Sequence, residues 1–157
     1  VAAMGKQLSS AYPGKEVGFV AMLNGAFMFA ADLMKKISIP CTISFIKVSS
    51  YEGESSTGKI TELIGINEDL SGKHIVLVED IVDTGMTIES ILPKLDKAGA
   101  ASVSICTLLF KPEAFKGTHH PEYIGFSIPN RFVVGYGLDY DGYGRNLNAI
   151  YQLKKED

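Results

Sequence analysis

The chain has 157 residues, of which 46% are apolar and 21% charged, and its formal net charge is −3. This length suits one domain with a buried core, and the composition is typical of a folded globular protein. Acidic and basic residues are mixed along the chain, so no basic face for nucleic acid is expected. Cys41 and Cys106 lie in apolar runs, which favours buried thiols of a cytoplasmic protein over a disulfide framework.

The most apolar stretch, residues 17–34, does not qualify as a membrane span. Asn24 and Gly25 interrupt it and Asp32 adds a charge near its end, so neither half can cross a bilayer. The continuous apolar run over 17–23 instead predicts a buried strand, followed by a turn and a helix. Apolar residues of that helix recur at spacings of three and four, at Phe27, Ala30, Ala31 and Met34.

Apolar runs alternate with helical patterns along the rest of the chain. Further strands are predicted over 41–48, 60–66, 75–79, 101–110 and 123–126, and Val133-Val134 lies just before a glycine- and tyrosine-rich loop. A helix that contains Pro93 and ends at Gly99 has one apolar face, made of Ile88, Ile91, Leu92 and Leu95. No linker or repeat divides the chain, so residues 1–157 are predicted to form one α/β domain with a mainly parallel sheet. The chain begins at Val1 without a visible signal peptide, and we expect natural N-terminal residues to precede it.

The segment Val78–Thr87, VEDIVDTGMT, places three carboxylates beside a glycine and two threonines at the end of a predicted strand. Ligands of open α/β sheets bind at the carboxyl ends of the strands. The N–H and hydroxyl groups of residues 83–87 precede a helix and suit a phosphate. Glu79 and Asp80 would repel that phosphate unless they face hydroxyl groups or hydrated Mg²⁺. Singly, an acid pair or a Thr-Gly cap is more often structural, but the ordered combination predicts a sugar phosphate that carries magnesium.

VLVEDIVDTGMT resembles the phosphoribosyl pyrophosphate motif of the type I phosphoribosyltransferases. Four further segments resemble the hypoxanthine-guanine branch of that family, in the same order, and the resemblance covers nearly the whole chain. LNGAFMFAADL resembles its pyrophosphate loop, SSYEGESSTG its mobile flap, LLFKP its purine-selecting strand end, and IPNRFVVGYGLDYDGYGRNL its purine- and metal-binding C-terminal segment. The implied fold is Rossmann-like, a mainly parallel sheet flanked by helices, with a small hood built from the terminal segments.

The resemblance implies a role for each residue around the predicted central strand. Glu79 and Asp80 match the residues that contact the ribose hydroxyls and bind magnesium. The 5′-phosphate cradle matches Asp83, Thr84, Gly85, Met86 and Thr87, although Met86 stands where the family often has a lysine or polar residue. Asp83 also matches the acid or base beside N7 of the purine, and is the expected catalytic residue.

A second group of matched residues surrounds the pyrophosphate. Leu23, Asn24 and Gly25 match the loop whose amides face the pyrophosphate, where family members have a non-proline cis peptide bond between the first two positions. From the residues alone, a simple strand-to-helix turn explains the glycine equally well. Arg145 matches a pyrophosphate contact. Ser50 and Tyr51 match flap residues that close over the reacting centre and exclude water.

The remaining matches concern the purine. Lys111 matches a lysine that donates to the 6-oxo group, which implies hypoxanthine or guanine rather than adenine. Phe132 matches a residue that stacks on the base, Val133 one whose backbone contacts its edge, and Asp139 a ligand of a second magnesium ion beside the base. Without the resemblance, Lys111, Asp139 and Arg145 are ordinary surface charges, and core packing explains Phe132 and Val133 equally well. Asn130-Arg131 departs from the family, which more often has an acid at the first position.

These matches predict a cytoplasmic purine-salvage enzyme, a pentosyltransferase. It would use Mg²⁺ and transfer phosphoribosyl from phosphoribosyl pyrophosphate to N9 of hypoxanthine or guanine, giving IMP or GMP and pyrophosphate. A homodimer or homotetramer is expected, without nucleic-acid or membrane partners.

One alternative is a regulator of the same fold that binds nucleotide without turnover, although Asp83, Lys111 and Asp139 are all present. A phospho-acceptor receiver domain would not need the phosphate loop, and His119-His120 is expected to be a solvated loop rather than a metal site.

Overall fold

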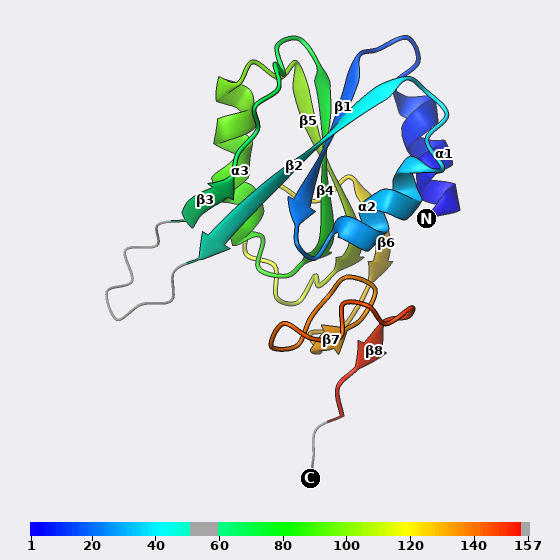
Figure 1. Ribbon diagram of the computed structural model, residues 1–157, viewed down its shortest axis with the longest axis vertical. Coiled ribbons are helices and arrows are strands. Elements are labelled where there is room, and N and C mark those ends of the chain that lie inside the picture. Colours follow the sequence, from blue (N-terminus) through cyan, green and yellow to red (C-terminus); the bar gives the residue numbers. More distant parts are fainter. Residues whose placement is uncertain (51–59, 155–157) are drawn as a thin grey trace.

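The computed structural model describes residues 1–50 and 60–154 of the chain. In these ranges a six-stranded sheet is covered by helices on both faces, and a two-stranded sheet lies beyond the carboxyl ends of its strands (Figure 1). The helices are α1 (Ala2–Ala11), α2 (Phe27–Met34) and α3 (Met86–Lys97). The strands are β1 (Val17–Leu23), β2 (Cys41–Ser50), β3 (Ile60–Ile64), β4 (His74–Val82), β5 (Ser102–Phe110), β6 (Tyr123–Ser127), β7 (Val133–Val134) and β8 (Tyr151–Gln152). None of the described helices is long and apolar enough to span a membrane.

The main sheet has the strand order β3-β2-β1-β4-β5-β6, and every neighbouring pair is parallel except β2 and β3. Side chains of a strand alternate between its two faces, so a central strand must be apolar throughout when both faces are covered. Phe19 and Val76 pack in the cluster with α1 and α2, whereas Val20 and Leu77 pack in the cluster with α3. The predicted mainly parallel sheet flanked by helices is confirmed.

Helix α3 follows the apolar pattern of its sequence. The four residues of the predicted face are buried, at Ile88, Ile91, Leu92 and Leu95, and the helix continues through Pro93. Its end is fixed by Gly99, whose φ of 85° is the left-handed conformation that glycine adopts without a steric penalty. The N–H of Gly99 donates to Asp96 O at 2.9 Å, and that of Ala100 donates to Leu95 O at 3.3 Å, which is the pattern of a Schellman cap.

Several elements differ from the sequence-based expectation. Helix α1 was not predicted, since only Met4, Leu8 and Tyr12 bring large apolar side chains from the N-terminal segment to the core. Strand β4 continues to Val82, because its last residues pair with the end of β5. Asp80 therefore lies within the strand rather than after it. Both cysteines are free, but only Cys106 is buried and Cys41 is half-buried.

The C-terminal segment forms the hood, with β7 and β8 as its small sheet. The N-terminal segment packs against the main sheet instead, as α1 beside α2 (Figure 1). Tyr136 ties the hood to α2, because its hydroxyl donates to Asp32 Oδ2 at 2.6 Å. Within the hood, Gly137 and Arg145 hold each other: the N–H of Gly137 donates to Arg145 O at 2.9 Å, and Arg145 Nη1 donates to Gly137 O at 2.7 Å.

Candidate active site

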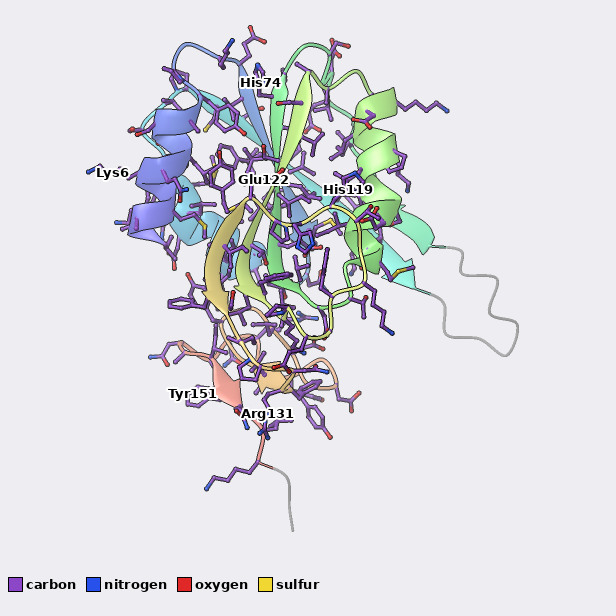
Figure 2. All side chains as sticks on the ribbon, turned by 180° about the vertical axis from the view of Figure 1, so that it is seen from behind. Lys6, His74, His119, Glu122, Arg131 and Tyr151 are labelled. Atoms are coloured by element: carbon purple, nitrogen blue, oxygen red, sulfur yellow. The ribbon has the colours of Figure 1, made fainter. Side chains whose placement is uncertain are left out.

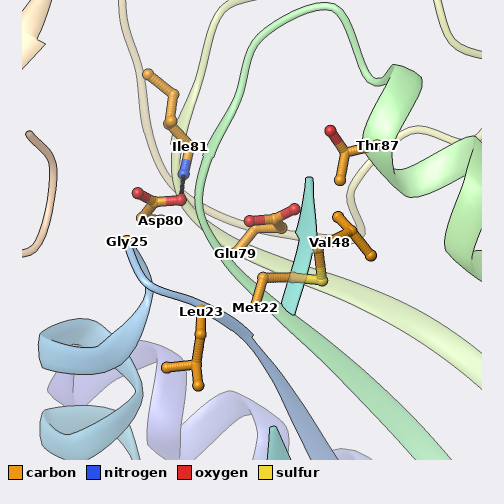
Figure 3. Close-up of a pocket in the computed structure, with 8 residues that line it drawn as sticks. All are labelled: Met22, Leu23, Gly25, Val48, Glu79, Asp80, Ile81 and Thr87. Atoms are coloured by element: carbon orange, nitrogen blue, oxygen red, sulfur yellow. Dashed lines mark hydrogen bonds between the residues drawn. The ribbon is translucent and has the colours of Figure 1, made fainter. Parts of the chain in front are cut away.

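Two adjoining cavities, each of about 240 Å³, open at the carboxyl end of β4 and share Asp80 and Ile81. The first, here called the acidic cavity, is also lined by Met22, Leu23, Gly25, Val48, Glu79 and Thr87 (Figure 3). The second, the hood cavity, is also lined by Asp83, Lys111, Phe132, Val133, Leu138 and Asp139. Their shared residues make them two halves of one cleft, and the hood cavity is the half that lies between the main sheet and the hood.

Glu79 and Asp80 bring two neighbouring carboxyl groups to the floor of the acidic cavity. Burial raises the pKa of Glu79 well above its usual value, and the adjacent Asp80 acts in the same direction. Burial also raises the pKa of Asp80, although the Ile81 N–H that donates to its Oδ1 at 2.9 Å opposes this rise. Glu79 is buried and Asp80 half-buried, and two neighbouring carboxyl groups with so little water favour a cation or hydroxyl donors beside them. Their oxygen atoms suit Mg²⁺, and a bound ligand would supply further oxygen ligands.

A very close approach at Gly25 joins three parts of the cleft. A Cβ atom at Gly25 would overlap the carboxylate of Asp80, which Figure 3 shows directed toward this position. A Cβ atom at Gly137 of the hood would overlap the Gly25 carbonyl oxygen. The peptide bond between Leu23 and Asn24 is cis, as the family resemblance predicted. The loop after β1 is therefore confined between an acid of β4 and the hood.

The turn over residues 83–87 leads from β4 into α3, which begins at Met86. Gly85 has a φ of 84°, and a Cβ atom there would lie 2.5 Å from the Phe115 ring, so the turn requires glycine on both counts. Thr84 and Met86 are exposed, while Thr87 lines the acidic cavity. The helix N-terminus carries partial positive charge, so this turn suits an anion at the edge of that cavity.

Lys111 and Asp83 meet in the hood cavity. Lys111 Nζ donates to Asp83 Oδ2 at 2.7 Å, and the lysine side chain is only 8% exposed. A buried ammonium group needs such a carboxylate partner. The backbone holds the same pair in place, because the Lys111 N–H donates to Val82 O at 2.9 Å. Phe132 is half exposed at the cavity rim, where its ring meets Tyr140 edge-on at 5.6 Å.

Asp139 and Arg145 form an ion pair at the hood side of the cleft. Arg145 Nη2 lies 2.9 Å from Asp139 Oδ1, and Asp139 Oδ2 accepts a hydrogen bond from the Gly142 N–H at 2.8 Å. Arg145 is also close enough to Asp80 to oppose the rise of its pKa. Asp139 and Arg145, which the resemblance places at a metal ion and at the pyrophosphate, thus lie together at the hood cavity, with Arg145 near Asp80.

Comparison with known proteins agrees with this geometry. The sequence profile of the phosphoribosyl transferase domain matches residues 1–141. The chain is 43% identical to the hypoxanthine-guanine phosphoribosyltransferase of Streptococcus pneumoniae, over 98% of this chain and 86% of that protein. It is 38% identical to the hypoxanthine phosphoribosyltransferase of Haemophilus influenzae, over 100% of this chain and 90% of that protein. The chain belongs to the phosphoribosyltransferase family.

A solved phosphoribosyltransferase supports the same assignment at the level of the fold. The crystal structure of a hypoxanthine phosphoribosyltransferase from Staphylococcus aureus matches with a TM-score of 0.92 at 40% identity, covering 98% of this chain and 84% of that one. The hypoxanthine-guanine branch named by sequence resemblance is therefore confirmed, as is the phosphoribosyltransferase fold.

The structure does not place every predicted site residue in the cleft, and it adds residues to which the sequence assigned no role. Ser50 ends β2, where its backbone pairs with Ile60, and Tyr51 of the expected flap lies outside the described residues. Ile81 and Leu138 line the cleft from within the quoted motifs, although no role was assigned to them, and Met22 and Val48 line it from outside those motifs. His119-His120 is exposed as expected, but both rings have partners. His119 Nδ1 lies 2.9 Å from Glu89 Oε2, and the His120 ring lies 4.5 Å from that of Phe115.

Tyr136→Phe should loosen the hood from α2 without emptying the core. The hydrogen bond from Tyr136 is the main cause of the lowered pKa of Asp32, followed by Lys35. A carboxyl group whose pKa falls on folding stabilises the protein above its unfolded pKa and loses this effect as pH falls through its folded pKa. We expect the variant to lose about 1–2 kcal/mol of unfolding free energy at pH 7, since the partner is charged but partly exposed.

Urea unfolding of the unchanged protein and of Tyr136→Phe at pH 7 and pH 3 measures the difference in their unfolding free energies. This difference should be smaller at pH 3. Tyr143→Phe is the matched control, because Tyr143 is a hood tyrosine that is 80% exposed. An equal loss at both pH values, or an equal loss in the control, would contradict the role given to the Tyr136 hydroxyl.

Proposed function

We propose that this protein is a purine-salvage enzyme that transfers 5-phosphoribosyl from phosphoribosyl pyrophosphate to N9 of hypoxanthine or guanine. The products would be IMP or GMP and pyrophosphate. The observation that supports this most strongly is the division of one cleft into an acidic half and a half with a buried lysine, joined at Asp80. A sugar phosphate and a 6-oxopurine suit these two halves, and the relatives of this chain have names that include hypoxanthine as a substrate.

The sugar phosphate would occupy the acidic cavity and its rim. Glu79 and Asp80 would accept hydrogen bonds from the ribose hydroxyls, and the backbone of residues 83–87 would hold the 5′-phosphate at the α3 N-terminus. The amides of the loop over residues 23–25 would face the pyrophosphate, with Arg145 donating to its oxygen atoms from the hood side. Each group of the ligand then meets a part of the cleft of suitable charge.

Magnesium fits the oxygen atoms that line this cleft. Glu79 and Asp80 would hold one ion together with the ligand's own oxygen atoms, and Asp139 a second. When bound, magnesium offsets the negative charge that develops on the departing pyrophosphate. Asp139 now pairs with Arg145 at 2.9 Å, so we propose that it turns from the arginine toward the ligand.

The purine would enter the hood cavity between Phe132 and the Lys111–Asp83 pair. Lys111 has donors only, so it would bond a 6-oxo group and leave a 6-amino group without a partner. Phe132 would stack on the base, and the Val133 backbone would contact its edge. As the bond from C1′ to pyrophosphate breaks and the bond from N9 to C1′ forms, the base loses a proton, which Asp83 would accept at N7.

Self-association and a cytoplasmic location complete the proposal. Exposed apolar side chains line a groove between α2 and β2, at Phe27, Ile43 and Phe45, which supports a homodimer or homotetramer. Sedimentation equilibrium distinguishes these states, and a monomer at micromolar concentration would contradict both. The two free thiols fit a reducing compartment such as the cytoplasm.

The substrate proposal predicts which bases react. Protein, Mg²⁺ and phosphoribosyl pyrophosphate are mixed with hypoxanthine, guanine, xanthine or adenine in turn, and nucleotide is measured by chromatography. We expect IMP and GMP to form, and adenine to react at least roughly 10³-fold more slowly, because its 6-amino group finds no acceptor on Lys111. Ligand binding without any nucleotide product would favour a nucleotide-sensing regulator instead.

Asp83→Asn should separate binding from chemistry. Asparagine keeps the size of the side chain but cannot take up the base proton, so turnover should fall by roughly 10²-fold or more. The dissociation constant of phosphoribosyl pyrophosphate, measured by calorimetry, should change little. Asp141→Asn is the matched control, because Asp141 is an exposed hood acid. Unchanged turnover in Asp83→Asn would remove this residue from the proton transfer.

A further inference from the structure

The segment over residues 111–120, which follows β5, packs behind the 83–87 turn. The Phe115 ring fills the space beside Gly85, and the Lys116 N–H donates to Thr84 O at 3.0 Å. Phe115 is itself held between Phe110, at a ring distance of 5.3 Å, and His120. The turn proposed to hold the 5′-phosphate is therefore supported from behind by a second segment.

One carboxylate of α3, that of Glu89, fixes the far end of this segment. Glu89 Oε1 accepts hydrogen bonds from the N–H groups of Thr118 at 2.6 Å and His119 at 2.9 Å. The Thr118 hydroxyl lies within 3.1 Å of both carboxylate oxygens, and His119 Nδ1 lies 2.9 Å from Oε2. Figure 2 shows His119 on this segment, beside α3. The bonds from His119, followed by those from Thr118, lower the pKa of Glu89 to about 2.

Glu89 also belongs to the first turn of α3, where its N–H donates to Gly85 O at 3.1 Å. The structure thus contains a closed ring that runs from Gly85 along α3 to Glu89, across to Thr118, and back through Phe115. Gly117 allows the ring to be this tight, since a Cβ atom there would lie 3.0 Å from Glu89 Oε1. A change at Glu89 should therefore reach the turn through residues 115–118.

We propose that Glu89 is a positioning residue for the 5′-phosphate, acting through Phe115 and Lys116 on the 83–87 turn. This inference rests on the proposed function, in which that turn binds the 5′-phosphate. Backbone donors hold an anion well only when their directions are fixed in advance. Gly85 has a left-handed conformation, and the contacts of Phe115 and Lys116 hold the turn in that arrangement.

The proposal has a kinetic pattern of its own. Phosphoribosyl pyrophosphate and IMP both have a 5′-phosphate, whereas hypoxanthine and pyrophosphate have none. Loss of Glu89 should therefore raise KM for phosphoribosyl pyrophosphate in the forward reaction and for IMP in the reverse reaction. KM for hypoxanthine and pyrophosphate should change little. Because KM does not depend on the concentration of active enzyme, a fraction of misfolded variant cannot produce this pattern.

The test compares Glu89→Ala and Glu89→Gln with Glu113→Gln, an exposed carboxylate of the same segment. For Glu89→Ala we expect KM of both 5′-phosphate ligands to rise about tenfold, equivalent to about 1.4 kcal/mol, with kcat within about threefold. Glu89→Gln keeps one oxygen for the two backbone N–H groups, so it should recover most of the affinity. Glu113→Gln should match the unchanged protein in all four KM values.

An equal rise in all four KM values, a fall in kcat alone, or no change in Glu89→Ala would overturn the proposal. Thr87→Val tests the phosphate site itself. If Thr87→Val raises KM for both 5′-phosphate ligands and Glu89→Ala does not, the role of Glu89 fails while the proposed site stands. If Thr87→Val changes neither value, the proposed 5′-phosphate site is at fault.

Discussion

The cleft depends on one steric constraint, the absence of a Cβ atom at Gly25. The Asp80 carboxylate occupies the space where that atom would lie, and Gly137 of the hood approaches the Gly25 carbonyl oxygen from another direction. Three segments far apart in the sequence meet here: the loop after β1, the end of β4, and the C-terminal hood. The Tyr136 bond to Asp32 holds the hood against α2, which begins directly after this loop. The acidic cavity and the hood cavity can therefore adjoin at Asp80, because Gly25 has no side chain that would displace the Asp80 carboxylate.

The acids of β4 illustrate how such a site departs from the rules that stabilise the rest of the fold. A parallel strand covered on both faces normally ends its buried part with apolar residues. Here β4 continues through Glu79 and Asp80 to Val82, and burial raises the pKa of both carboxyl groups. In the protein alone these two carboxyl groups, one buried and one half-buried, have less of the water that would stabilise their charge. A ligand that brings hydroxyl groups and a cation would stabilise the charged carboxylates in place of water. Ligand binding should therefore stabilise this region of the protein.

The sequence predicted the parts of the structure that depend on local patterns. The bounds of β1 follow from its continuous apolar run and the buried face of α3 from its periodicity, while most residues of the two cavities lie in motifs whose order matches a known family. Contacts between distant residues could not be found in this way. Tyr136 and Asp32 are 104 positions apart. His119 belongs to a polar stretch that resembles an ordinary solvated loop, and only the fold shows that Glu89 holds it. Helix α1 has too few apolar residues for a clear period, and its burial depends on α2 and the sheet.

The position of Asp83 is set less by its own motif than by the segment that follows β5. The carbonyl oxygen of Val82 accepts from the Lys111 N–H, and that of Thr84 accepts from the Lys116 N–H, so both neighbours of Asp83 are held by residues 111–116. The Lys111 ammonium group binds the Asp83 carboxylate itself at 2.7 Å. Three consecutive residues, from the end of β4 into the turn, are thus held by one stretch of chain. The same segment begins at Lys111, the proposed purine contact, and continues to Thr118 and His119, which bind Glu89. It therefore joins the two ends of the proposed nucleotide site.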